Sequence, residues 1–299
     1  MSADLEAALD ARGDRVRVDP DADWLAAHAD RVRIIVTGGQ TGAPRDLIEA
    51  LANLGLIAIN GVGYDKVDIA HAAARGVSVT NTPGVLTDDV ADLAIGLVIG
   101  LLRDLPHADA HARSGAWANG DLPLARKVTG QRFGIVGLGR IGSAIADRLR
   151  AFGPVAYTGR SQKPVDLPFH PDAASLAAAS DVLIVAVAAS AETRHLIDAR
   201  VLEALGPGGV LVNVARGSVV DEDALVEAIR EQRIAGAALD VFADEPNVPG
   251  ALIDSDRTML TPHIASATVE TRAAMAALVL DNIDAFLGQR PLPTPIPPP

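Results

Sequence analysis

A glycine-rich segment near the middle of the chain constrains the fold more than any other part of the sequence. Residues Phe133–Gly142 read FGIVGLGRIG, a GxGxxG spacing directly after an apolar run and directly before a helical pattern. In a strand–turn–helix unit, the glycine at 137 makes a tight turn, the one at 139 lets backbone amides approach a pyrophosphate, and the one at 142 lets helix and strand pack closely. The helix N-terminus adds partial positive charge. The segment therefore predicts a dinucleotide site at Gly137, Gly139 and Gly142 rather than a simple glycine-rich turn.

Short apolar runs alternate with helical patterns along the chain, which indicates right-handed βαβ units and doubly wound parallel sheets. Most runs are apolar at consecutive positions, as in strands that are covered on both faces. The predicted strands are Arg15–Val18, Arg33–Thr37, Leu56–Asn60, Val77–Thr80, Phe133–Gly137, Val155–Thr158, Val182–Val187, Val210–Val214, Ala237–Val241 and Met259–Thr261. The predicted helices are Asp46–Asn53, Val67–Arg75, Thr87–Arg103, Ile141–Phe152, Asp198–Leu205, Asp221–Gln232 and Val269–Leu287.

Two turn-rich segments predict the domain boundaries. Asn81–Gly84 precedes a long helical pattern, and Ser266–Thr268 precedes the last one. Because the strand before the second segment belongs with the glycine-rich unit, the last helix is predicted to return to the first domain. The expected domains are 1–84 with 268–299, and 85–267. The tail PLPTPIPPP is predicted to be polyproline-type or disordered, since proline lacks a backbone donor.

Composition excludes several classes of function. The chain has 26 basic and 38 acidic residues, a net charge of −12, which argues against nucleic-acid and anionic-membrane partners. It has no cysteine, which removes disulfides, thiol nucleophiles and Cys-ligated metals, and no His/Asp/Glu spacing resembles a metal site. The longest apolar run, Leu93–Leu102, is too short to cross a bilayer, and the opening residues show no signal peptide. We expect a cytoplasmic protein.

The loop after the second strand of the glycine-rich unit bears on the choice of cofactor. NAD calls for an acidic residue there, which binds the ribose 2′-hydroxyl. The sequence instead reads GRSQK from Gly159 to Lys163. Arg160 and Ser161 could bind a 2′-phosphate, with Lys163 as an outer, screened charge. The alternative is a solvated basic loop. NADPH is therefore the predicted cofactor, with NAD(H) as the alternative.

Three motifs follow predicted strands and carry side chains suited to catalysis. They lie at the C-terminal ends of these strands, where open α/β sheets bind ligands. Arg216 lies in NVARG, Glu245 in DVFADEP and His263 in TPHIAS. An arginine can clamp a carboxylate with two hydrogen bonds and polarise an adjacent carbonyl. A histidine can give or take a proton, and a neighbouring glutamate favours imidazolium. Each alone could be a surface cation, a loop turn or a buried histidine, but the three in order favour a catalytic site.

Together with the glycine loop and NTPGVLTDDVAD at 81–92, these motifs resemble the D-2-hydroxyacid dehydrogenase family over nearly the whole chain. The resemblance implies a smaller, flavodoxin-type substrate domain and a Rossmann cofactor domain, with the active site in the cleft. It implies Arg216 as binder of the carboxylate and carbonyl, His263 as proton donor and acceptor, and Glu245 as its partner. It further implies a homodimer joined through the cofactor domains, in which the arm around Trp117 reaches the partner.

Within that family, the segments GRS, WANGDLPL and NGVG are most similar to NADPH-linked glyoxylate, hydroxypyruvate and hydroxyphenylpyruvate reductases. This implies that backbone amides of Val62 and Gly63 meet the substrate carboxylate and that Ser266 lines the pocket. Beyond the glycines, the basic loop and His263, it implies cofactor contacts at Thr87, Leu138, Arg140, Ile141, Val187, Val214, Ala215 and Asp240, of which Thr87 and Asp240 match positions against the nicotinamide.

The chain departs from the family in two places. Members usually begin with a strand before the first helix, whereas this chain opens at that helix, which leaves an alternative start site or a missing central strand open. The segment Val187–Ser190 reads VAAS, where family chains often carry Leu/Val-Pro-Leu-Thr. The lost proline affects the expected detail of the cofactor loop but not the chemistry.

The sequence therefore predicts an NADPH-dependent reductase that converts a 2-oxo acid of glyoxylate or hydroxypyruvate type to the D-2-hydroxy acid, with His263 as proton donor. Two alternatives remain. One is an NAD(P)-binding, corepressor-like sensor on the same scaffold, which the intact Arg/Glu/His set disfavours. The other is an NAD-linked family member that oxidises phosphite or formate; the basic loop disfavours its cofactor, though not its substrate.

Overall fold

The computed structural model describes residues 3–16 and 22–298. The chain divides into two compact units. The first unit consists of Met1–Leu86 and Ala267–Pro299, and the second unit consists of Thr87–Ser266. Both units are built on parallel sheets with helices on their faces, which confirms the predicted α/β class.

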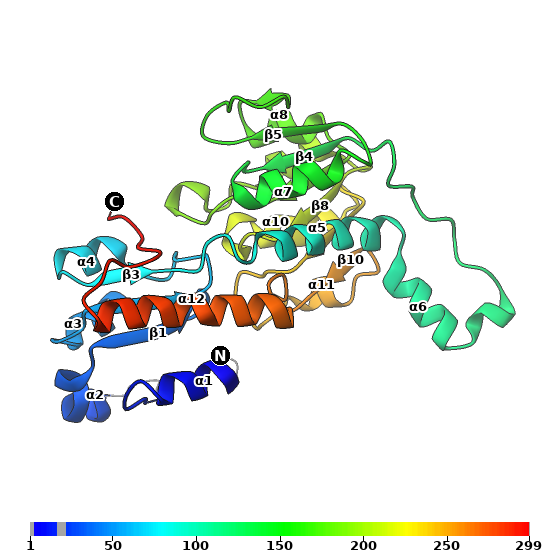
Figure 1. Cartoon of the computed structure of the whole chain (residues 1–299). Helices are drawn as coiled ribbons and strands as arrows, with labels where there is room; N and C mark the ends of the chain where they lie inside the picture. Colours follow the sequence, from blue (N-terminus) through cyan, green and yellow to red (C-terminus); the bar gives the residue numbers. More distant parts are fainter. Residues whose placement is uncertain (1–2, 17–21, 299) are drawn as a thin grey trace. The chain divides into compact units, whose positions relative to one another are not determined.

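The first unit contains a three-stranded parallel sheet in the order β1-β2-β3 (Figure 1). The hydrophobic core of this unit follows from the side chains of β2, because successive side chains of a strand point to opposite faces of the sheet. Leu56 and Ala58 pack with α1 and α12, whereas Ile57 and Ile59 pack with α3 and α4. The elements are α1 (Ala3–Asp10), α2 (Ala22–His28), η1 (Ala29–Arg31), β1 (Ile34–Gly38), α3 (Arg45–Ala50), β2 (Leu56–Asn60), α4 (Ile69–Ala74), β3 (Ser78–Thr80) and α12 (Val269–Leu287).

The predicted strand Arg15–Val18 is wrong for its first two residues, which lie outside any strand. Arg15 turns back on α1, where its guanidinium lies 2.7 Å from Asp10 and 3.4 Å from Glu6. The rest of this predicted strand, residues 17 and 18, lies outside the described residues. In the described part of the first unit, β1 is therefore the edge strand of a sheet smaller than a five-stranded flavodoxin-type sheet.

The proline-rich tail is ordered against the sheet, so the alternative of a disordered tail is wrong for residues 291–298. The amide of Ile296 donates to Val79 at 2.8 Å, and the hydroxyl of Thr294 donates to the carbonyl of Asn81 at 2.6 Å. The side-chain amide of Asn282 on α12 donates to Thr294 at 2.9 Å. The non-proline residues of the tail thus supply the donors that proline lacks.

The second unit contains a seven-stranded parallel sheet in the order β10-β9-β8-β7-β4-β5-β6. The strand order reverses at β4, and this switch point is where open α/β sheets bind ligands. The elements are α5 (Thr87–Leu102), α6 (Leu105–Arg113), η2 (Ala116–Asn119), β4 (Phe133–Val136), α7 (Arg140–Leu149), β5 (Val155–Thr158), β6 (Phe169–His170), α8 (Ala173–Ala178), β7 (Val182–Val185), η3 (Ala191–Thr193), α9 (Ala199–Leu205), β8 (Val210–Asn213), η4 (Gly217–Val219), α10 (Glu222–Arg230), β9 (Gly236–Leu239), α11 (Gly250–Ile253) and β10 (Thr258–Leu260).

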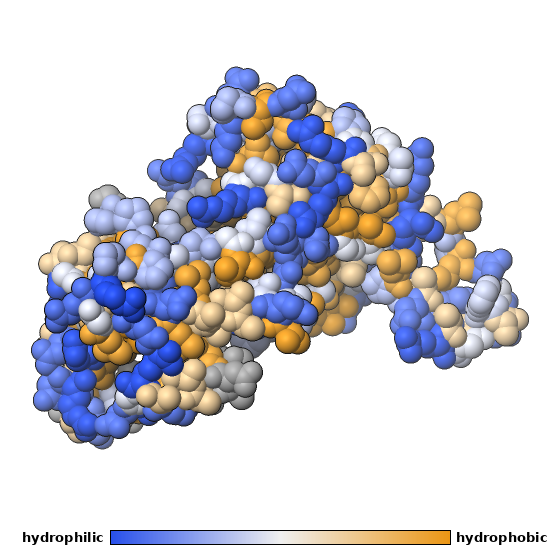
Figure 2. All heavy atoms as spheres, in the orientation of Figure 1, coloured by the Kyte–Doolittle hydropathy of each residue, from blue (hydrophilic) through white to orange (hydrophobic). Residues whose placement is uncertain are grey.

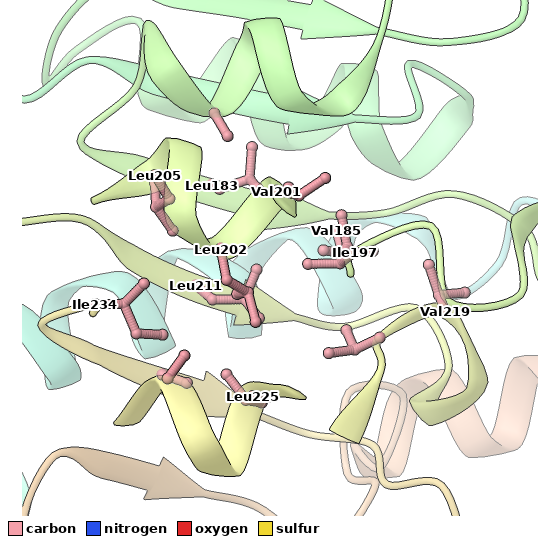
Figure 3. Packing of buried hydrophobic residues seen from close by; sticks show 14 of the residues in the cluster. Leu183, Val185, Ile197, Val201, Leu202, Leu205, Leu211, Val219, Leu225 and Ile234 are labelled. Carbon is pink, nitrogen blue, oxygen red and sulfur yellow. The ribbon is translucent and has the colours of Figure 1, made fainter. Parts of the chain in front are cut away.

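Helices cover both faces of this sheet, as the consecutive apolar residues of its strands predict. On one face, Leu183 and Val185 of β7 and Leu211 of β8 pack with Val201 and Leu202 of α9 (Figure 3). Each such side chain contributes roughly 1.5–3 kcal/mol on burial. On the other face, α5 packs against α7 and against β8, β9 and β10.

The remaining predicted strands are confirmed to within two residues at their ends. Several were predicted too long at their carboxyl ends, because residues such as Gly137, Val187 and Val214 are apolar or small but already belong to the loops that follow. Strand β6 was missed, since two residues give no periodic signal. In the described part of the chain, no helix is both long enough and apolar enough to cross a bilayer.

Candidate active site

The glycine loop lies between β4 and α7 and leaves no room for side chains at two positions. Gly137 has φ +96°, and a Cβ there would lie 2.7 Å from Cα of Val187. A Cβ at Gly142 would lie 2.0 Å from the carbonyl oxygen of Gly137. The amide of Gly137 also donates to Thr158 at 2.9 Å, which ties the loop to the end of β5. These contacts explain the first and third glycines of the motif.

The middle glycine faces open space. A Cβ on Gly139 would meet no atom within 4 Å, and no side chain of the described residues caps the first turn of α7. Arg140 and Ile141 begin the helix, whose buried face is formed by Ile145 and Leu149. Helix N-terminal amides that face open space attract anions. The loop therefore fits the pyrophosphate of a dinucleotide.

The basic loop after β5 presents its side chains to solvent. Arg160 and Ser161 are exposed, and within the described residues the Arg160 guanidinium has no ion pair. Lys163 differs from the expected outer, screened charge, because its Nζ donates to the carbonyl of Leu138 in the glycine loop. Lys163 is thus attached to the glycine loop, whereas Arg160 is available to bind a ligand.

The loop after β7 stands against the glycine loop at Val187. The hydroxyl of Thr193 accepts the amide of Ser190 at 2.8 Å and donates to the carbonyl of Ala188 at 2.9 Å. Ser190 and Thr193 together form a capping box at η3. Two hydroxyls therefore hold this segment, where family chains often carry a proline.

Arg216 lies in a turn that Asn213 holds at the end of β8. The side chain of Asn213 accepts the amide of Ala215 at 3.0 Å and donates to the carbonyl of Arg216 at 3.0 Å. Val214 and Ala215 are buried, whereas the Arg216 side chain is half-buried and donates to the carbonyl of Ala215 at 2.8 Å. The turn thus fixes the backbone from which the guanidinium extends.

Gly217 brings the loop of Arg216 against the loop of Glu245. A Cβ at Gly217 would lie 1.9 Å from the carbonyl carbon of Phe242, so only glycine allows this approach. Glu222 at the start of α10 accepts the amide of Ala243 at 3.1 Å and holds the same loop from the other side. Two of the three predicted catalytic loops are therefore in direct contact.

Glu245 and His263 form a hydrogen-bonded pair. Nδ1 of His263 lies 2.8 Å from Oε2 of Glu245, and Oε1 accepts the amide of Phe242 at 3.0 Å. The side chains are 23% and 18% exposed, so the contact is largely shielded from water. His263 has φ +53°, a conformation that few residues other than glycine adopt. Nδ1 is thus the ring nitrogen directed to the glutamate.

Asp240 anchors the loop that carries His263. Its fully buried carboxylate accepts the hydroxyl of Thr261 at 2.7 Å and the amides of Ile264 and Ala265 at 2.8 and 2.9 Å. Its carbonyl accepts the amide of His263 at 2.8 Å. Burial raises the pKa of Asp240, and these donors lower it in part. The predicted contact of Asp240 with the nicotinamide stays a prediction.

The other predicted site residues lie at loops or element ends. Val62 and Gly63 follow β2 in the first unit, where the side-chain amide of Asn81 donates to the carbonyl of Val62 at 2.8 Å. Thr87 begins α5, and Ser266 ends the second unit. Among the described residues, no group of three or more His, Asp and Glu residues could hold a metal ion.

Sequence reasoning assigned no role to four residues that hold the site together. Asn213, Gly217 and Thr261 stand within the three motifs, so their positions were visible although their contacts were not. Glu222 stands outside every motif. Its contact with Ala243 joins residues 21 positions apart, for which the sequence carries no signal.

Known proteins resemble this chain over most of its length. Residues 95–265 match the family of the D-isomer specific 2-hydroxyacid dehydrogenase, NAD binding domain. Hydroxyphenylpyruvate reductase of Plectranthus scutellarioides is 46% identical, over 99% of this chain and 96% of the relative. Glyoxylate/hydroxypyruvate reductase A of Arabidopsis thaliana is 45% identical over the same shares.

A solved structure shows the same similarity in three dimensions. The NADPH-dependent glyoxylate/hydroxypyruvate reductase of Sinorhizobium meliloti, in complex with NADP and malonate, superposes with a TM-score of 0.94. It is 45% identical, and the match covers 99% of this chain and 94% of that chain.

Proposed function

Because this chain belongs to the D-isomer specific 2-hydroxyacid dehydrogenase family, we propose that it catalyses the NADPH-dependent reduction of a 2-oxo acid to the D-2-hydroxy acid. The observation that carries this proposal is the pair of His263 and Glu245, 2.8 Å apart in loops after β9 and β10. These loops belong to the same parallel sheet that carries the glycine loop at its switch point. A proton donor and a dinucleotide loop on one sheet are what a carbonyl reductase needs.

Each catalytic residue has a defined task in the proposed reaction. When bound, the nicotinamide cofactor supplies the hydride that the carbonyl carbon receives. Glu245 orients the His263 ring, so that Nε2 can give a proton to the carbonyl oxygen. Arg216 binds the carboxylate and stabilises the charge that develops on that oxygen. Donors fixed in this way typically lower a barrier by about 3–4 kcal/mol each.

The two units have different tasks in this proposal. The second unit binds NADPH through the glycine loop, Arg160 and Ser161, with Thr87, Val187, Val214, Ala215 and Asp240 around the nicotinamide half. In the first unit, the amides of Val62 and Gly63 are assigned to the substrate carboxylate in addition to Arg216. Ser266, at the end of the second unit, is assigned to the lining of the substrate pocket. The backbone after β2 supports this, because Asn81 holds the carbonyl of Val62.

The substrates we propose are small 2-oxo acids such as glyoxylate and hydroxypyruvate, the compounds for which several relatives are named. The test is a panel of glyoxylate, hydroxypyruvate, 4-hydroxyphenylpyruvate and 2-ketogluconate, each assayed with NADPH and with NADH. We expect turnover of at least one of the first three, faster with NADPH. Absence of turnover with every acid and both cofactors would contradict the proposal and favour a sensor that binds nucleotide without catalysis.

Arg160 is expected to select the cofactor. The Arg160→Ala variant should raise KM for NADPH by roughly 10- to 150-fold, the range of a charged hydrogen bond, and leave KM for NADH almost unchanged. Added salt should weaken NADPH binding more in the wild type than in the variant. Initial rates over a range of both cofactors measure this. If the variant loses both cofactors equally, Arg160 does not contact the 2′-phosphate.

Glu245 is expected to hold the His263 ring in place for the reaction. In a Glu245→Gln variant the carboxylate that lies 2.8 Å from Nδ1 is replaced by an amide, which can still hydrogen-bond to the ring but carries no charge. The kcat for the reduction should therefore fall by roughly tenfold or more, the lower end for a charged hydrogen bond. Steady-state kinetics measure the change, with Asp244→Asn in the same loop as control. A Glu245→Gln variant with the kcat of the wild type would rule out the pairing.

We also propose that the protein forms a homodimer through an arm made of α6, η2 and residues 120–127. This arm extends away from the seven-stranded sheet of its own unit (Figure 1), and hydrophobic side chains lie on its surface (Figure 2). Leu105 is 49% exposed, Trp117 67% and Leu124 fully exposed. Three large apolar side chains exposed on one arm support an interface with another chain.

Replacing Leu124 with aspartate should convert the dimer into a monomer. The side chain has no packing to lose within its own chain, so the variant should fold normally. Light scattering during gel filtration measures the mass in solution. Val165, which is exposed on the same unit outside the arm, provides the control Val165→Asp. A Leu124→Asp protein that stays dimeric would exclude the arm as the interface.

A further inference from the structure

Lys163 connects the basic loop after β5 to the glycine loop. Its Nζ donates to the carbonyl oxygen of Leu138, which stands between Gly137 and Gly139. Lys163 is an exposed residue, and this bond joins its charge to the glycine loop. The ammonium group thus lies beside the backbone that approaches the cofactor.

The backbone of Lys163 is held by a buried tyrosine. Tyr157 on β5 is fully buried, and its hydroxyl accepts the amide of Lys163 at 2.6 Å. The ring packs against Phe169 of β6, with ring centroids 5.4 Å apart. Residues 159–163 are therefore anchored at both ends, by β5 at one and by Tyr157 at the other, and the Lys163 ammonium is brought to a defined place.

That place lies between two phosphate positions of the proposed cofactor. In a Rossmann unit the pyrophosphate binds at the N-terminus of the first helix, here α7, and the ribose 2′ position lies at the end of the second strand, here β5. Leu138 precedes α7, and Lys163 follows β5. A flexible four-carbon side chain that already joins these two loops can reach a phosphate on either side.

We propose that Lys163 is a second cation of the 2′-phosphate site, whose ammonium passes from the carbonyl of Leu138 to the 2′-phosphate when NADPH binds. The inference rests on the proposed cofactor preference and adds a residue to it. The exchange is favourable because a phosphate carries up to two negative charges and a carbonyl only a partial one. The chain has a net charge of −12, which repels an anionic cofactor. Two cations near the 2′-phosphate offset this repulsion better than one arginine does.

The test is the dissociation constant of NADPH and of NADH, which differ only in the 2′-phosphate, measured by the fluorescence of the bound nucleotide. The variants are Lys163→Met, which keeps the length of the side chain without its charge, and Lys163→Arg, which keeps the charge. Arg230→Met is the control for the loss of a charge, because Arg230 is an exposed cation of the same unit, on α10. The kcat at saturating NADPH is measured in parallel.

We expect Lys163→Met to weaken NADPH binding by roughly tenfold, the lower end for a charged hydrogen bond, and to leave NADH binding unchanged. Lys163→Arg should retain most of the affinity, kcat should stay near the wild-type value, and Arg230→Met should behave as the wild type. If Lys163→Met binds both nucleotides equally less tightly, Lys163 only holds the glycine loop in shape. If NADPH binding is unchanged, Lys163 makes no contact with the 2′-phosphate. Either result overturns the inference. A wild type that binds both nucleotides equally overturns the cofactor preference itself, which is a separate outcome.

Discussion

Replacing His263 with alanine is expected to lower kcat for the reduction by about 10²–10⁴-fold and to leave the affinity for NADPH nearly unchanged. In the wild type, Nε2 of this ring donates the proton that the carbonyl oxygen needs. In the variant, water has to donate that proton. Cofactor affinity should persist because the glycine loop and Arg160 lie in other loops of the sheet. Steady-state kinetics and a nucleotide titration measure the two quantities separately.

His71→Ala is the control for this substitution. His71 also faces a carboxylate, with Nε2 3.5 Å from Glu49, but it lies on α4 of the first unit, outside the three motifs. Its loss should leave kcat close to the wild-type value. Near-normal turnover of His263→Ala would remove His263 from the mechanism.

Replacing Arg216 with lysine is expected to raise KM and lower kcat together, with a loss in kcat/KM of about 10²-fold or more. Lysine keeps the positive charge but lacks the planar two-donor fork that matches a carboxylate. Since the same guanidinium also stabilises the carbonyl oxygen, the loss extends from substrate binding to the transition state. The backbone should be unaffected, because Asn213 holds the turn through the carbonyl of residue 216 and not through its side chain.

Arg230→Lys, on the exposed face of α10, is the matched control for the same chemical change. It should leave kcat/KM unchanged. A kcat/KM of Arg216→Lys comparable to the wild-type value would show that the substrate anion is held elsewhere, for instance by the amides of Val62 and Gly63 alone.

The sequence predicted those features that depend on local pattern. The glycine spacing located the turn between β4 and α7, because only glycine fits where a Cβ would lie 2.0 Å from a carbonyl oxygen. Consecutive apolar residues located the covered strands, and the helix Val269–Leu287 was predicted with its observed bounds. The pairing of Glu245 with His263 was implied by the resemblance to the family, and the structure places the two side chains 2.8 Å apart.

Features that depend on particular side-chain contacts, and not on local pattern, could not be predicted. Arg15 was expected in a strand, but its guanidinium turns back to Asp10 and Glu6 of α1, a contact that the apolar pattern does not indicate. Lys163 was expected to be screened by solvent, and its attachment to Leu138 spans 25 positions. The proline-rich tail has no local reason to be ordered, and the sheet edge that binds it lies more than 200 residues earlier in the chain.

The stereochemistry of the product tests the central claim most directly. If Arg216 holds the carboxylate and His263 faces the carbonyl oxygen, only one face of the carbonyl carbon can receive hydride. The measurement is chiral chromatography of the glycerate formed from hydroxypyruvate and NADPH, alongside the amount of NADPH consumed. The account predicts D-glycerate alone, in an amount equal to the NADPH oxidised. L-glycerate, a mixture of both forms, or no oxidation of NADPH would contradict it.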